Sequence, residues 1–63
     1  MRYSIKIDVW KFGNKYGKPD ETKTVGDYYT QEAAEVDMKT IEFRLMYAGY
    51  DKIRLEVIEI QDD

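Results

Sequence analysis

The chain has 63 residues, of which 43% are hydrophobic, 37% charged and 14% aromatic, and its net charge is −3 at pH 7. A chain this short forms one small domain that buries only about 60% of its unfolded surface, so oligomerisation or a partner would add useful stability. It contains no cysteine and no histidine, which excludes disulfides, thiolate zinc sites, thiol nucleophiles and histidine general bases.

The remaining polar residues do not compose a catalytic set. Ser4 is the only serine, so a Ser-His-Asp triad cannot exist within the chain. Carboxylates are plentiful, but a chain of this length has little room for a cleft that holds two of them around a substrate. We therefore expect a protein that is not an enzyme and that requires no cofactor or metal ion.

No segment approaches the roughly 20 apolar residues that a membrane-spanning helix needs. The N-terminal residues alternate in polarity and lack the apolar centre of a secretory signal. We expect a complete, cytoplasmic chain with no membrane partner. Basic residues concentrate in residues 1–23 and acidic ones in residues 24–63, a mixed distribution that is typical of a solvated surface.

The first predicted element is a strand over about residues 2–12. Tyr3, Ile5, Ile7 and Val9 alternate with polar residues, which is typical of a half-buried strand. Glycine, asparagine and a Pro-Asp pair in residues 13–20 predict the loop of a hairpin. The Thr and Val residues that follow favour an edge strand over about residues 21–27.

A helix is predicted over about residues 31–48. Thr30 is a suitable N-cap with acid in the first turn, and Gly49 is well placed to end the helix. Residues 53–60 alternate again, which predicts a last strand over about residues 52–60. The roles of Tyr28 and Tyr29, as strand, loop or cover, stay open.

The first and the last predicted strand share one pattern of charge. Placing Ile7 opposite Leu55 in an antiparallel pair sets Lys6 against Glu56, whereas a parallel pair would place like charges together. This predicts an α+β domain of ββαβ order, with a three-stranded antiparallel sheet in the order 2-1-3 and one helix on one face. The alternative is that the match arises by chance, because alternating charge is common in strands.

The predicted helix carries apolar residues on two opposite sides. One stripe faces the sheet and comprises Ala34, Met38, Ile41, Leu45 and Ala48. The opposite stripe comprises Val36, Thr40, Phe43 and Tyr47, and we interpret it as a surface for a protein partner or for a second copy of the chain. The alternatives are that Tyr28-Tyr29 or the C-terminal tail covers Phe43, or that the stripe has no role.

A second aromatic cluster is predicted on the outer face of the sheet, where Trp10, Phe12 and Tyr50 would lie together. Aromatic side chains are enriched at the centres of protein interfaces, so this cluster is a second candidate for partner binding. The alternative is that a bulge returns Trp10 or Ile58 to the core.

The hairpin also interleaves bases with aromatic rings, at Lys11, Lys15, Tyr16 and Lys18 among others. This pattern suits single-stranded nucleic acid, because rings stack on bases and lysines follow phosphates. Lysines that protect an edge strand from pairing would produce the same sequence.

The stretch Ala48-Gly49-Tyr50, followed by a strand from Ile53 to Val57, resembles the turn from helix to last strand in small phage-encoded inhibitors of host enzymes, such as the phage T7 inhibitor of bacterial RNA polymerase. The resemblance implies a compact inhibitor that occupies a surface, and it assigns no functional residue. We expect a non-catalytic protein-binding module that inhibits or modulates a host protein. The alternatives are a homodimeric scaffold protein and a single-stranded nucleic-acid-binding module.

Overall fold

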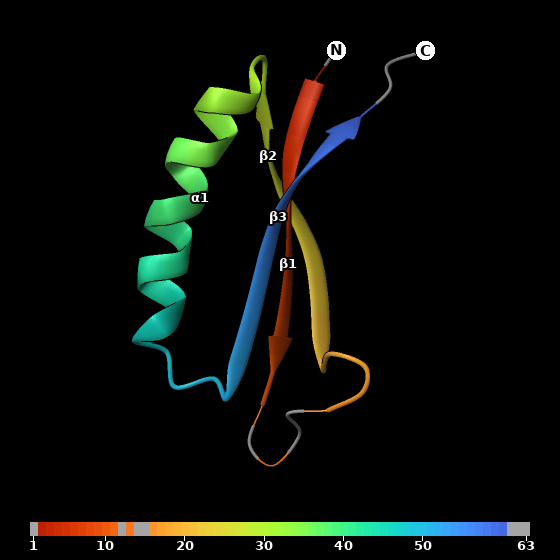
Figure 1. Cartoon of the computed structure of the whole chain (residues 1–63), viewed down its shortest axis with the longest axis vertical. Helices are drawn as coiled ribbons and strands as arrows, with labels where there is room; N and C mark the ends of the chain where they lie inside the picture. Colours follow the sequence, from red (N-terminus) through yellow and green to blue (C-terminus); the bar gives the residue numbers. More distant parts are fainter. Residues whose placement is uncertain (1, 12, 14–15, 61–63) are drawn as a thin grey trace.

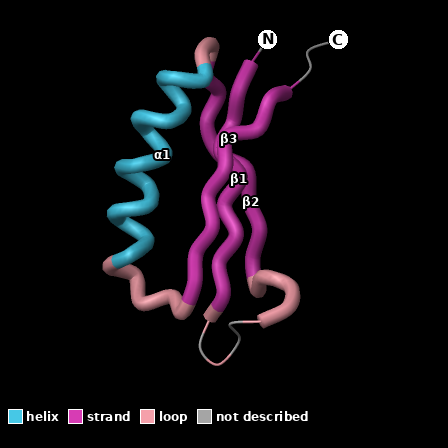
Figure 2. Tube along the Cα trace, in the orientation of Figure 1, coloured by secondary structure: helices cyan, strands magenta, loops and turns pink. Residues whose placement is uncertain are grey.

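A computed structural model describes residues 2–11, 13 and 16–60. Its elements are β1 (Arg2–Trp10), β2 (Glu21–Tyr28), α1 (Gln31–Met46) and β3 (Lys52–Ile60). The strands form one antiparallel sheet in the order β2-β1-β3, and α1 lies along one face of it (Figures 1 and 2). The predicted α+β fold of ββαβ order is therefore confirmed. β1 ends at Trp10 and not near residue 12.

The pairing of β1 with β3 follows the register that the charges predicted. Ile7 lies opposite Leu55, Lys6 opposite Glu56 and Asp8 opposite Arg54. The face that α1 covers consequently carries the aliphatic residues Ile5, Ile7, Val9, Ile53, Leu55 and Val57. A solvent-accessible charge pair such as Lys6 and Glu56 contributes only about 0.2–1 kcal/mol, so its effect is to favour one register over another.

The pairing of β1 with β2 contains a bulge near Gly26. Ile5 lies opposite Val25, but Tyr3 lies opposite Tyr28, so β2 has one extra residue between these pairs. Gly26 has a φ of +83°, which a residue with a side chain rarely adopts. Because the bulge shifts the alternation by one residue, Tyr28 faces α1 instead of the outer face.

Tyr28 thereby becomes part of the core between β2 and α1. Its hydroxyl donates a hydrogen bond to Asp37 of the helix, and this bond, reinforced by burial, raises the pKa of Tyr28. The Tyr28 ring also occupies the space that a Cβ atom on Gly26 would need. Tyr28 is therefore a strand residue that ties β2 to the helix.

The core lies along β1, where Ile5, Ile7 and Val9 are all buried. On the helix only Ala34 is fully buried, and the rest of the predicted inner stripe is half-buried, namely Met38, Ile41 and Leu45. Ala48 was predicted to join them, but it lies beyond the end of α1 and is exposed. The inner stripe is shorter than expected because the helix ends earlier.

Both ends of α1 follow from local sequence. The Thr30 hydroxyl accepts a hydrogen bond from the backbone N–H of Ala33 at 3.1 Å, so the predicted N-cap is confirmed. The helix ends at Met46, Tyr47 is its C-cap, and Gly49 turns the chain toward β3 with a φ of +84°. Among the described residues, α1 included, no helix has the length and apolar character needed to cross a membrane.

Candidate functional site

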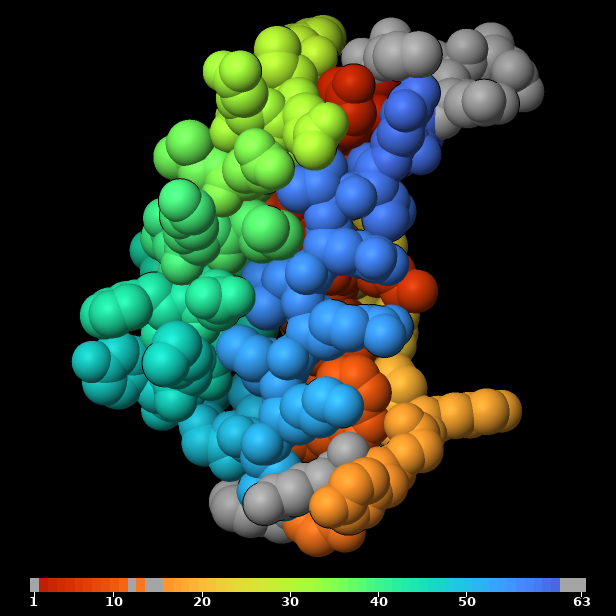
Figure 3. Space-filling view, in the orientation of Figure 1, coloured from red at the N-terminus to blue at the C-terminus, as the bar shows by residue number. Residues whose placement is uncertain are grey.

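The outer face of α1 carries the apolar stripe that the sequence predicted. Val36, Phe43 and Tyr47 are 67%, 61% and 78% exposed, and Thr40 between them is also exposed. Figure 3 shows the later part of the helix, in teal, projecting away from the sheet. We call Val36, Thr40, Phe43 and Tyr47 the outer stripe.

The two aromatic rings at the end of the outer stripe contact each other. The rings of Phe43 and Tyr47 meet edge to face, with centroids 5.1 Å apart and an angle of 66° between their planes. Such a pair is a favourable arrangement of two rings. The pair places the two rings side by side on the surface of the helix, where they form one apolar patch.

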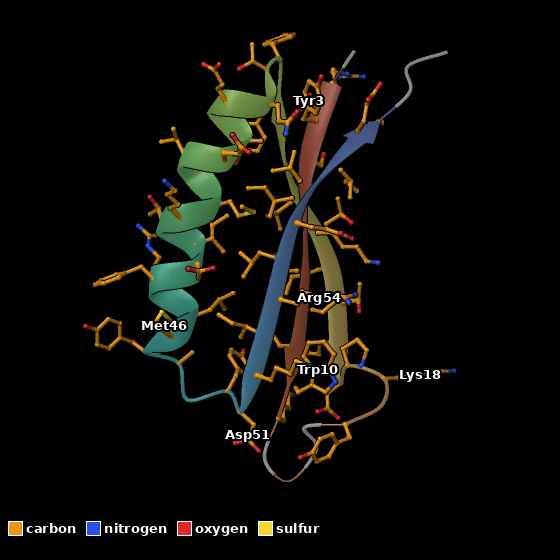
Figure 4. The ribbon with its side chains drawn as sticks, viewed as in Figure 1. Tyr3, Trp10, Lys18, Met46, Asp51 and Arg54 are labelled. Atoms are coloured by element: carbon orange, nitrogen blue, oxygen red, sulfur yellow. The ribbon has the colours of Figure 1, made fainter. Side chains whose placement is uncertain are left out.

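Sequence reasoning missed Met46, which lies beside this pair and is 68% exposed. At 100° per residue Met46 falls on the flank of the helix next to Phe43, so its helical position was the signal that could have identified it. Figure 4 shows Met46 at the end of α1 nearest the turn to β3. A flexible thioether next to two rings enlarges the apolar surface and adapts readily to a partner's shape.

None of the described residues covers the outer stripe. Tyr28 faces the core, and Tyr29 is itself 85% exposed. The C-terminal tail, which was the other predicted cover, falls at residues 61–63 and lies outside the described residues. The stripe is therefore not covered by any part of the fold that the structure describes.

Trp10 and Tyr50, the two described members of the predicted aromatic cluster, do not lie together on the outer face of the sheet. Trp10 does lie on that face, but it is only 4% exposed. Its indole N–H donates to the carbonyl of Gly17 at 3.1 Å, and Lys52 Nζ lies 4.7 Å from its ring centroid. The hairpin and a neighbouring lysine cover the ring, so Trp10 stabilises the hairpin instead of presenting a surface.

The other two members of that cluster are also placed differently. Tyr50 is half-buried against the core on the helix side. β3 begins only at Lys52, so strand alternation does not extend back to Tyr50 and does not direct it to the outer face. Phe12 lies outside the described residues.

The positive charge of the basic hairpin is partly balanced by acidic residues of the same hairpin. Lys11 Nζ lies 3.5 Å from Glu21 Oε1, and the Lys11 backbone N–H donates to Asp20 at 2.6 Å. Tyr16 is 89% exposed, and Lys18 projects away from the sheet in Figure 4. Lys15 lies outside the described residues. Tyr16 and Lys18 are accessible, whereas the charge of Lys11 is balanced within the chain.

Asp8 is a buried carboxylate on the outer face of the sheet, with only 2% of its surface exposed. It accepts a hydrogen bond from the Thr22 hydroxyl at 2.7 Å and two from the Arg54 guanidinium at 3.2 and 2.9 Å. The Thr22 bond and then the Arg54 bond hold the pKa of Asp8 below its usual value, although burial opposes them. All three strands are joined at this point, so the cluster has a structural role.

The described residues contain neither a metal centre nor an unsatisfied buried polar group. No group of three or more acidic side chains among them is arranged to hold a metal ion. Every buried side-chain nitrogen or oxygen in this part of the chain has a hydrogen-bond partner. Comparison with known protein families, curated proteins and solved structures finds no match to this chain.

Proposed function

We propose that this chain is a non-catalytic protein-binding module that docks on another protein through the outer stripe of α1. The observation that carries the proposal is the exposure of Val36, Phe43 and Tyr47 on one side of a helix whose other side packs on the sheet. Phe and Tyr are among the residues most enriched in the centres of protein interfaces. The sequence also lacks cysteine and histidine, the residues on which much of enzyme chemistry depends.

The fold does not need the outer stripe for its own stability. The core is formed by β1 with the opposite side of α1, and the buried polar groups of the described residues are satisfied without a second chain. Exposed apolar side chains that make no contact with the core lower solubility, so recognition explains the stripe better than the fold does. We therefore assign the stripe to recognition of another protein, and self-association through the same stripe is the alternative that the experiments below distinguish.

Binding through one helical face would act by occupying a surface on the partner. The two aromatic rings would form the apolar centre of the contact. The charged residues that flank them, such as Glu35 and Lys39, would form its rim. The resemblance of the helix-to-strand turn to small phage-encoded inhibitors supports, as a resemblance, a role in inhibiting or modulating a host protein.

Site-specific photo-crosslinking in the source cells tests this proposal. A photoreactive phenylalanine analogue replaces Phe43 in one variant and Thr24 in the control. Thr24 suits the control because it is exposed on β2, remote from the outer face of α1. We expect one protein to be crosslinked from position 43 and not from position 24, and the crosslink to disappear when Tyr47→Asp is added.

Equal crosslinking from both positions would contradict the proposal, because it would indicate nonspecific contact. A crosslink from position 43 to another copy of the chain would replace the proposed partner with self-association. Circular dichroism of each variant establishes that the fold is retained in every comparison.

A further inference from the structure

A groove of about 360 Å³ opens between the later half of α1 and the β1–β2 side of the sheet. Its apolar lining comprises Ile7, Val9, Val25, Ile41, Leu45 and Tyr50. Sites for small molecules typically measure about 300–1,000 Å³ and are lined mainly by apolar side chains. The groove therefore has the size and lining of a site for one small ligand.

The position of the helix explains why the groove exists. α1 packs more extensively on β3 than on β2, so the inner face of the edge strand is only partly covered. The inward residues at the start of β2 are Glu21 and Lys23, which do not fill the space as aliphatic side chains would. Val25, Ile41 and Leu45 are thus only half-buried at the open side of the groove, whereas Ile7 and Val9 beneath them are buried.

The polar rim of the groove is predominantly basic. Lys23 comes from β2 and Arg44 from α1, and both line the groove. Neither forms an ion pair with the part of the chain that the structure describes, whereas the rim residue Glu21 is paired with Lys11. The rim therefore presents two basic side chains and one acidic one beside an apolar floor, and of the three only the acidic one is in an ion pair with a described residue.

We propose that this groove binds an alkyl carboxylate of medium chain length. The carboxylate would lie between Lys23 and Arg44, and the alkyl chain would cover the floor at Val25, Ile41 and Leu45. The volume accommodates one short chain, which excludes a lipid with two long acyl chains. Arg44 lies on the flank of α1 that faces β2 and not in the outer stripe, so the site is independent of the proposed protein-binding surface.

Titration of the isotope-labelled full chain, followed by backbone amide chemical shifts, tests this inference. The probes are decanoate and decyltrimethylammonium, each below the concentration at which it forms micelles, and decanol below its solubility limit. We expect saturable shifts with decanoate at Val25, Ile41 and Leu45, weaker binding of decanol and the weakest binding of the cation. Octanoate should bind about tenfold more weakly than decanoate, because two buried methylene groups are lost.

Removing the two rim charges distinguishes a site for a carboxylate from a nonspecific apolar surface. In Lys23→Gln/Arg44→Gln the affinity for decanoate should fall about tenfold, since exposed charge pairs are individually weak. The affinity for decanol should not change. Lys39→Gln, which removes an exposed helical lysine that does not line the groove, is the matched control and should bind decanoate as the wild type does.

Three results would overturn the inference. They are the absence of saturable shifts with decanoate, equal affinity for decanoate and the cation, and shifts centred on Phe43 and Tyr47. If the double variant does not fold, the wild-type titration is repeated at high salt. Screening should then weaken decanoate binding and leave decanol binding unchanged, and no difference between the two would equally overturn the inference.

Discussion

Replacing Gly26 with alanine tests the bulge that returns Tyr28 to the core. Gly26 has a φ of +83°, and the Tyr28 ring occupies the space that its Cβ would need. Gly49 offers a matched control, since its φ is +84° and nothing lies within 4 Å of its Cβ position. Both substitutions impose the same backbone strain, but only Gly26→Ala also displaces a ring.

The two costs can be estimated separately. A residue with a side chain in the left-handed region costs about 1–2 kcal/mol, and this is the expected loss for Gly49→Ala. Overpacking against a neighbouring side chain costs about 1–3 kcal/mol more, so Gly26→Ala should lose about 2–5 kcal/mol. For a domain of this size each kcal/mol lowers Tm by about 4–8 °C.

Urea unfolding of the wild type, both alanine variants and a Tyr28→Ala background measures these values. In that background the ring is absent, so adding Gly26→Ala should cost only the backbone strain of about 1–2 kcal/mol. Equal losses for Gly26→Ala and Gly49→Ala in the wild-type background would refute the reasoning. The Tyr28 ring would then not lie over Gly26, and the bulge would not be the reason for its position.

Three further predictions concern single side chains. Because the pKa of Asp8 lies below its usual value, its carboxylate stabilises the fold above about pH 4, and that stability is lost as the pH falls through the folded-state pKa. Asp8→Asn should lower Tm at neutral pH and flatten the acid side of a plot of Tm against pH. Because the pKa of Tyr28 is raised, the wild type should lose stability as the pH rises above about 10, and Tyr28→Phe should lose less in urea unfolding over that range. Phe43→Asp should change the unfolding free energy by less than about 1 kcal/mol. Ile41→Asp, on the other side of the helix, should lower it by about 3 kcal/mol or more in the same urea assay.

For each of these variants, one particular result would contradict the prediction. If the Tm of Asp8→Asn falls as steeply with decreasing pH as that of the wild type, carboxylates other than Asp8 control acid unfolding. If Tyr28→Phe loses as much unfolding free energy as the wild type above about pH 10, ionisation of the Tyr28 hydroxyl is not the cause of the alkaline loss. A large loss of stability in Phe43→Asp would place Phe43 in the core.

Much of the fold follows from local patterns in the sequence. Alternation identified β1 and β3, and the charges of Lys6 and Glu56 indicated both the antiparallel direction and the register. Thr30 and Gly49 marked the two ends of the helical region. These features depend on residues that are close in sequence or directly paired, which is why sequence reasoning could find them.

The features that sequence reasoning missed depend on how separate segments meet. Gly26 marks a bulge only because Tyr28 packs against α1 beyond it, and a glycine after Thr and Val equally resembles the end of a strand. Trp10 is covered because the hairpin carbonyl of Gly17 reaches its indole N–H. Similarly, the groove beside Lys23 arises from the position of the whole helix over the sheet. None of these arrangements has a signature in a short stretch of sequence.

The state of the outer stripe in solution can be measured directly. Light scattering across a concentration series gives the molar mass of the wild type and of Phe43→Asp, each checked for folding by circular dichroism. If the stripe is free for a different protein, both should be folded monomers of about 7.5 kDa at every concentration. A wild type that is dimeric, with a folded monomeric Phe43→Asp, would contradict the proposal, because a second copy of the chain would already occupy the stripe.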